Sequence, residues 1–220
     1  MMDARRILVL APHTDDAELG CGGTIARFVE EGRQIFVVAF SIATESLPAG
    51  WAPDTLRTEF DLAMSALGVQ PGNVRALNYP VRRFPERRQD ILEELVTLKK
   101  ELRPDLVLLP SATDCHQDHA TIAAEGIRAF RDVSVFGYEM AWNNVAFSGQ
   151  AFVVLEPGHL EKKWQAIQEY KSQFALGRSY LSHDLLTGLA RLRGEQARVA
   201  FAECYEVLRL KITVAREGTK

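Results

Sequence analysis

Cysteine is scarce in this chain. Of its 220 residues only Cys21, Cys115 and Cys204 are cysteines, and no two of them form a C-x-x-C pair. An odd number without that spacing argues against a disulfide framework. We therefore expect a protein that works in the reducing environment of the cytoplasm.

Long apolar runs and an excess of charge of either sign are also absent. No run approaches the ~20 residues that a membrane-spanning helix needs. The run after Arg6 ends at Pro12 and His13, which makes it too short for a signal peptide. The 26 basic and 29 acidic residues give a net charge of −3, which provides no electrostatic attraction to nucleic acid or to an anionic membrane. We expect neither as a partner.

The chain contains no Ser/Gly-rich linker, no block of like charges and no internal repeat. Its length suits one α/β domain, and a hydrophobic fraction of 47% supplies enough material for a core. The sequence thus predicts a single domain over residues 1–220.

Short apolar runs alternate with amphipathic stretches over the first 140 residues. The runs predict strands over residues 7–10, 35–40, 74–77, 106–109 and 133–138. The amphipathic stretches predict helices over residues 23–31, 54–67, 85–102 and 119–130. This order indicates an α/β, Rossmann-like domain, in which a mostly parallel sheet lies between two layers of helices.

Beyond residue 140 the pattern is less regular. It predicts a strand over residues 151–155, helices over 159–170 and 181–202, and a closing strand over 205–212. We expect these elements to complete the same sheet and its helical layers.

Two polar stretches follow the first and fourth predicted strands. By analogy with doubly wound sheets we expect the strand order 3-2-1-4-5, which makes these two strands neighbours and their carboxyl ends a ligand-binding crevice. Three of the five histidines of the chain lie in the two stretches. The acidic and imidazole side chains there are His13, Asp15, Asp16 and Glu18 in the first, and Asp114, His116, Asp118 and His119 in the second.

Neutral imidazole and carboxylate are ligands that zinc and similar divalent metals accept together. His13 and Asp16 are the candidate ligands in the first stretch, and the spacing in the second permits either His116 or His119. Asp15, beside these ligands, is placed to take a proton from metal-bound water. The sequence therefore predicts a metal site assembled from both stretches.

The two stretches resemble the motifs of the LmbE-like, or PIG-L, de-N-acetylases. The first motif reads Pro12-His13-x-Asp15-Asp16-x-Glu18 and is followed by Gly20-Cys21-Gly22-Gly23, and the second reads His116-x-Asp118-His119. Weaker likeness at residues 57–68 and 170–173 extends the resemblance from residue 7 to about residue 175. Thr14 stands where proline is usual in the family, a departure that removes no ligand.

The resemblance implies a zinc-dependent hydrolase that removes an N-acetyl group from an N-acetylglucosamine-type sugar or sugar conjugate. It implies that His13, Asp16 and His119 bind Zn²⁺ or another divalent transition metal, with water at an open fourth position. Asp15 is then the general base, and His116 stabilises the negative oxygen that forms on the substrate. Because related enzymes often assemble, the resemblance also points to a homo-oligomer.

Three further residues are candidates, and the first two have more than one interpretation. Asp118 either orients a histidine through its second ring nitrogen or caps the helix that follows. Arg57 resembles an arginine that the family places near the sugar, but its spacing also suits a surface ion pair with Asp54 or Asp61. Asn143 lies in a predicted loop and offers an amide to a sugar hydroxyl.

Two other functions fit parts of the sequence. The acidic, glycine-rich segment 18–23 is similar to the cofactor turn of S-adenosylmethionine-dependent methyltransferases, although in that fold the glycines follow the first strand at once. A non-catalytic sugar-binding module on the same fold is the other alternative. Cofactor binding and metal content distinguish these from a deacetylase.

Overall fold

The apolar runs form one seven-stranded sheet in the computed structural model, which describes residues 4–212. The strands are β1 (Arg6–His13), β2 (Gln34–Ser41), β3 (Val74–Ala76), β4 (Leu106–Pro110), β5 (Ser134–Tyr138), β6 (Ala151–Leu155) and β7 (Phe201–Arg209). The α-helices are α1 (Asp16–Glu30), α2 (Thr55–Ala66), α3 (Arg88–Leu102), α4 (Gln117–Ala129), α5 (Pro157–Gln168), α6 (Lys171–Ala175) and α7 (His183–Ala197). No helix within the described range is long and apolar enough to cross a membrane.

The strands lie in the order β3-β2-β1-β4-β5-β7-β6. The first five of these run parallel, whereas β7 lies antiparallel between β5 and β6. The predicted order 3-2-1-4-5 is therefore confirmed, and β1 and β4 are direct neighbours.

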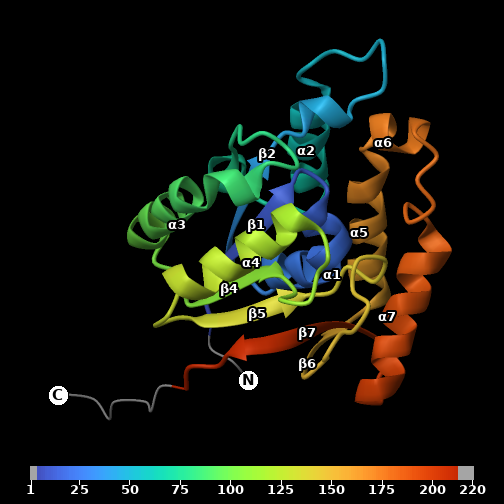
Figure 1. Cartoon of the computed structure of the whole chain (residues 1–220). Helices are drawn as coiled ribbons and strands as arrows, with labels where there is room; N and C mark the ends of the chain where they lie inside the picture. Colours follow the sequence, from blue (N-terminus) through green and yellow to red (C-terminus); the bar gives the residue numbers. More distant parts are fainter. Residues whose placement is uncertain (1–3, 213–220) are drawn as a thin grey trace.

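Two hydrophobic clusters, one on each face of the sheet, make the core. On β1 the side chains alternate between them, so that Ile7 and Val9 belong to one cluster and Leu8 and Leu10 to the other. The first cluster takes residues from α1, α2, α5 and α7, and the second takes residues from α3 and α4. Figure 1 shows α3 and α4 in green on one side of the sheet, and α5 and α7 in orange on the other. The three-layer α/β prediction is confirmed.

Helix α1 begins at Asp16 rather than at residue 23, and it is broken at Cys21, whose φ of −146° is not helical. Gly20 and Gly23 allow α1 to pack closely against the sheet. A Cβ at Gly20 would overlap the ring of Tyr138, and a Cβ at Gly23 would overlap Leu155. The sequence prediction placed the start of the helix too late, because it read these glycines as the beginning of the helix.

Helix α7 ends at Ala197, so the predicted helix over residues 181–202 was too long. Arg198 adopts a left-handed conformation with a φ of 57°, and its N–H bonds back to the carbonyl of Glu195. Such a residue ends a helix, but it is usually glycine or asparagine, so an arginine gave no signal. Strand β7 accordingly starts at Phe201 and ends at Arg209 instead of covering 205–212.

A buried ion pair joins the two halves of α1 where the helix is broken. Glu203 of β7 accepts hydrogen bonds from the backbone N–H groups of Gly23 (3.0 Å) and Thr24 (2.7 Å). Lys163 of α5 donates to the carbonyl of Leu19 (2.9 Å) and to Glu203 (2.7 Å). The carboxylate and the ammonium thus replace the helical hydrogen bonds that the break removes. They hold the first half of α1, which carries Asp16.

We expect Lys163→Met to destabilise the protein by about 3–5 kcal/mol, because it leaves the carboxylate of Glu203 buried without its partner. Glu203→Gln should also destabilise, and the double variant should lose less than the sum of the two single variants. Denaturant unfolding of the four proteins measures this coupling. The exposed pair Arg75–Glu101 is the matched control, since Glu101→Gln should cost less than about 1 kcal/mol. Additive effects at 163 and 203 would contradict the interpretation.

Candidate metal centre

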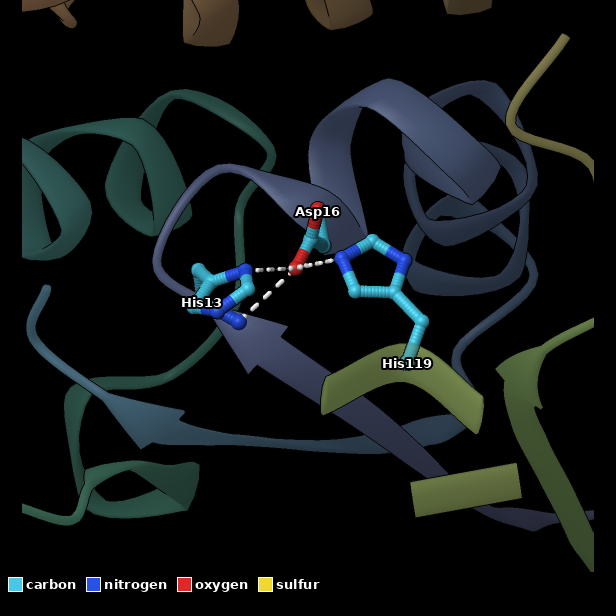
Figure 2. A group of neighbouring side chains, drawn as sticks. All are labelled: His13, Asp16 and His119. Carbon is cyan, nitrogen blue, oxygen red and sulfur yellow. Dashed lines mark hydrogen bonds and ion pairs between the residues drawn. The ribbon is translucent and has the colours of Figure 1, made fainter. Parts of the chain in front are cut away.

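The two polar loops meet at the carboxyl ends of β1 and β4. The carboxylate oxygen Oδ2 of Asp16 lies 3.1 Å from Nδ1 of His13 and 3.3 Å from Nε2 of His119. The same oxygen accepts a hydrogen bond of 2.8 Å from the backbone N–H of His13. Figure 2 shows this oxygen between the two imidazole rings. Residues about a hundred positions apart are thereby brought into one cluster.

Each imidazole of the cluster has a second carboxylate on its other ring nitrogen. Asp118 Oδ2 lies 3.0 Å from Nε2 of His13, and Asp114 Oδ2 lies 2.8 Å from Nδ1 of His119. Metal-binding histidines characteristically have such an outer partner, which fixes the ring and its tautomer. The inner nitrogens, Nδ1 of His13 and Nε2 of His119, are left facing Asp16.

Two groups of three side chains in residues 4–212 have ligand atoms close enough to share one metal ion. One is His13, Asp16 and His119, and the other is His13, His116 and Asp118. The first group fits a metal better, because its outer nitrogens are already bound by carboxylates. In the second group Nδ1 of His116 accepts a hydrogen bond from the backbone N–H of Asp118. The donor set of two imidazoles and one carboxylate suits zinc or a similar divalent ion.

The charges around the cluster favour a cation. Burial lowers the pKa of His13, but Asp16 and Asp118 outweigh it and raise the pKa to about 9. Burial also lowers the pKa of His119, which Asp16 and Asp114 raise to about 10. Burial raises the pKa of Asp16, yet the two imidazoles bring it below the usual range. The mutual attraction of imidazole and carboxylate is the common cause of these shifts.

A cavity of about 320 Å³ opens beside the cluster. Asp15 lines it from the N-cap position of α1, where its side chain makes no capping hydrogen bond. Burial, followed by the negative charge of Asp16, raises the pKa of Asp15 to about 6. A carboxyl group in that range suits a proton acceptor that later returns the proton.

His116 also lines the cavity, and it occupies the N-cap position of α4. Its Nδ1 accepts from the backbone N–H of Asp118 at 3.2 Å, so a neutral ring carries its proton on Nε2. Burial, followed by the charges of His119 and His13, lowers the pKa of His116 and so favours the neutral form. The ring therefore has one N–H to donate on the side away from the helix.

The structure decides between the two interpretations of Asp118 and of Arg57, and it locates Asn143. Asp118 does not cap α4, because His116 does, and its carboxylate instead contacts His13. Asn143 lines the cavity. Arg57 is not among the residues that line it, and its Nε pairs with Asp61 at 2.9 Å on α2. The surface-pair interpretation of Arg57 therefore agrees with the structure.

Sequence reasoning gave no role to Asp114, which is buried and holds His119. The available signal was the symmetry of the second motif, in which Asp114 stands two residues before His116 and Asp118 two residues after it. Two carboxylates at this spacing suggest outer partners for two histidines. Two other cavity residues, Arg178 and Tyr180, were also missed. They lie between α6 and α7, where the sequence shows no motif.

The two stretches of weaker likeness, residues 57–68 and 170–173, are connected to the first polar loop by buried hydrogen bonds. The hydroxyl of Tyr170 contacts the carbonyl of Thr14 and lies 2.6 Å from Oε1 of Glu18. Ser172 donates its N–H and its hydroxyl to the buried carboxylate of Glu59, at 2.8 Å and 2.6 Å. These contacts tie α2 and α6 to the loop that carries Asp15 and Asp16.

The chain is similar to proteins named as deacetylases. It is 27% identical over 172 residues to the uncharacterized deacetylase YaiS of Escherichia coli, a match that covers 76% of this chain and 90% of YaiS. It is 28% identical over 207 residues to a 1D-myo-inositol 2-acetamido-2-deoxy-alpha-D-glucopyranoside deacetylase of Rhodococcus erythropolis, covering 79% and 69% of the two chains.

A solved structure shares the fold. The N,N'-diacetylchitobiose deacetylase of Pyrococcus horikoshii superposes with a TM-score of 0.76 at 22% identity, over 93% of this chain and 84% of that one. The family model described as GlcNAc-PI de-N-acetylase, PIG-L, matches residues 8–130, which contain both polar loops and more than half of the chain. This chain belongs to the PIG-L family of GlcNAc-PI de-N-acetylases.

Proposed function

We propose that this protein is a zinc-dependent hydrolase that removes the N-acetyl group from an N-acetylglucosamine-type sugar or sugar conjugate. One observation carries the proposal: the cluster of His13, Asp16 and His119, with a carboxylate behind each imidazole, opens on a cavity that also holds Asp15 and His116. Membership of the PIG-L family and the deacetylase names of the relatives support the same reaction.

His13, Asp16 and His119 would hold the metal ion. Three protein ligands leave a position open, as in catalytic rather than structural zinc sites. When bound, a divalent ion such as zinc lowers the pKa of water and withdraws electrons from a carbonyl oxygen. The chemistry that remains falls to the side chains of the cavity.

Asp15 is the proton carrier in this mechanism. Its carboxylate lines the cavity and takes a proton from the water molecule whose oxygen attacks the amide carbon. As the carbon–nitrogen bond breaks, the protonated Asp15 returns that proton to the leaving amine. Acetate and the free amino sugar are the products.

His116 acts on the other atom of the reacting amide. As water adds, the carbonyl oxygen gains negative charge, and a donor that is already in place stabilises it. The Nε2–H of neutral His116 is such a donor, because its Nδ1 is fixed by the backbone of α4. Asn143 and Trp142 line the same cavity, and one face of Trp142 is covered by Tyr180, stacked at 4.6 Å.

The other functions have less support. A methyltransferase needs the backbone of Gly20–Gly23 open to its cofactor, but those glycines lie inside α1, against Tyr138, Lys163 and Leu155. A sugar-binding module without catalysis needs neither Asp15 nor the outer carboxylates. The presence of Asp15 in the cavity, and of Asp114 and Asp118 behind the histidines, therefore favours a hydrolase.

The remaining expectations stay proposals. All three cysteines are free, which fits the cytoplasm. We also propose that residues 1–220 act as one deacetylase domain, since a single sheet runs through the part of the chain that the structure describes. The homo-oligomer that the family resemblance implies stays a prediction.

Protein purified without chelator should contain one divalent ion per chain, measured by elemental analysis. His119→Ala should lose the ion, because it removes a ligand. Asp114→Asn should weaken metal affinity by about 10–100-fold, because a neutral amide orients the ring of His119 less firmly. Cys115→Ser is the control, since Cys115 is exposed and outside the cluster. Full metal content in His119→Ala would end the assignment.

Asp15→Asn should keep the metal and lower kcat by about 10²–10⁴-fold, because the amide cannot accept the proton of water. Acetate release from N-acetylglucosamine derivatives, with and without chelator, measures this. Asp61→Asn, on the exposed face of α2, should leave the rate unchanged. Undiminished turnover in Asp15→Asn would remove Asp15 from the mechanism.

His116→Ala should lower kcat by about 10²–10³-fold with little change in KM, because the lost donor acts on charge that develops only during the reaction. The variant also loses the N-cap of α4, which we expect to cost about 1 kcal/mol. A thermal unfolding curve separates the two effects. If kcat falls no further than the folded fraction does, His116 has no catalytic role.

A further inference from the structure

Two arginines line the metal cavity without serving the metal cluster. Arg82 follows β3, and Arg178 lies between α6 and α7. Within residues 4–212 the guanidinium of Arg82 pairs with Glu45 alone, at 3.5 Å, and both side chains are more than half exposed. Arg178 pairs with no carboxylate among the described residues, and its Nε donates to the amide oxygen of Gln173 at 3.0 Å.

Two carboxylates of the site, Asp16 and Asp118, already have partners, whereas Asp15 interacts with Arg178 through its charge. Asp16 lies between the two imidazoles. Asp118 contacts His13 and also accepts hydrogen bonds from the backbone N–H groups of Arg82 (2.5 Å) and Phe84 (3.2 Å). Neither guanidinium forms an ion pair with Asp15, Asp16 or Asp118. Their positive charge therefore remains available to a molecule in the cavity.

The backbone fixes Arg82 beside the metal cluster. Its φ of 66° is left-handed, a conformation that favours glycine or asparagine. Strained residues of this kind persist where the surroundings hold them, and they concentrate at functional sites. Here the N–H of Arg82 donates to Asp118, which in turn contacts His13. The strained backbone thus holds the side chain of Arg82 near His13, a proposed metal ligand.

Arg178 is held by a chain of contacts that leads into the core. Gln173, its partner, follows Ser172, which is tied to the buried Glu59 of α2. On its other side the guanidinium lies 5.9 Å from the ring centroid of Tyr180. Arg178 also has a side-chain hydrogen bond with Tyr180. Beyond these two partners the guanidinium keeps further N–H donors for a ligand, in the forked geometry that suits a carboxylate or a phosphate.

We propose that Arg82 and Arg178 bind an anionic group of the substrate, and that the enzyme therefore prefers acidic N-acetyl amino sugars or conjugates over neutral ones. The proposal rests on the proposed deacetylase function and adds the charge of the substrate to it. A carboxylate and a phosphate share the chemistry that the two guanidinium groups recognise. The 320 Å³ cavity places both arginines and the metal cluster within one binding space.

Acetate release tests this with matched sugars. N-acetylmuramic acid carries a carboxylate, N-acetylglucosamine 6-phosphate carries a phosphate, and N-acetylglucosamine is neutral. We expect kcat/KM for at least one acidic sugar to exceed that for the neutral sugar by about tenfold or more, mainly through KM. Comparison of the two acidic sugars shows which anion the site takes. Added salt should reduce this preference.

Arg178→Gln and Arg82→Gln should each reduce the ratio of acidic to neutral kcat/KM by about tenfold, and Arg178→Lys should retain part of it. Arg83→Gln is the matched control, because Arg83 is exposed, pairs with Glu86 and does not line the cavity. Equal use of acidic and neutral sugars, or a ratio unchanged in both glutamine variants, would overturn the proposal.

Failure of the proposed function has a different signature. If no N-acetyl sugar releases acetate from metal-loaded protein, the deacetylase proposal fails. Calorimetric titration with N-acetylglucosamine 6-phosphate, N-acetylmuramic acid and N-acetylglucosamine then decides the charge preference alone. Tighter binding of an acidic sugar that is lost in Arg178→Gln supports the two arginines as an anion site, and equal binding of all three sugars rejects it.

Discussion

The parallel pairing of β1 with β4 is the constraint on which the site depends. Ile7, Leu8 and Val9 lie opposite Leu106, Val107 and Leu108, so both strands deliver the loops that follow them to one edge of the sheet. There α1 begins with Asp16 and α4 begins just before His119. Both strands are buried on both faces, and a slip of one residue would exchange every side chain between the two hydrophobic clusters. The core therefore fixes the register, and the register fixes which residues meet.

The carboxylates at this edge of the sheet have two different roles. Asp16 faces the shared space between the imidazoles, whereas Asp114 and Asp118 bind the outer ring nitrogens. Backbone N–H groups hold these outer carboxylates in turn, from His116 to Asp114 and from Arg82 and Phe84 to Asp118. The orientation of each ring is thus set by two successive layers of hydrogen bonds, which is the arrangement that keeps a functional geometry within a few tenths of an ångström.

Much of this could be predicted from the sequence, and the remainder has physical reasons for escaping. The strand order followed from apolar runs and fold analogy, and His13, Asp16 and His119 came from two local motifs. Arg178 and the Lys163–Glu203 pair depend on contacts between segments far apart in the chain, for which local spacing has no signal. Asp114 is different, because its partner His119 lies only five residues further along the same polar stretch. The ends of α1 and α7 were misplaced for another reason, because a broken helix and a left-handed arginine do not show in hydrophobic periodicity.

The position of β7 within the sheet has a consequence for how the protein is made. Because β7 lies between β5 and β6, β6 leaves the ribosome with no strand to pair with until residues 201–209 have been translated. Glu203, which caps the second half of α1 behind the metal loop, arrives in the same segment. A nascent chain that stops short of it lacks the carboxylate that accepts the N–H groups of Gly23 and Thr24. The hydrogen bonds that bridge the break in α1 thus wait on a residue synthesised 180 positions after Gly23.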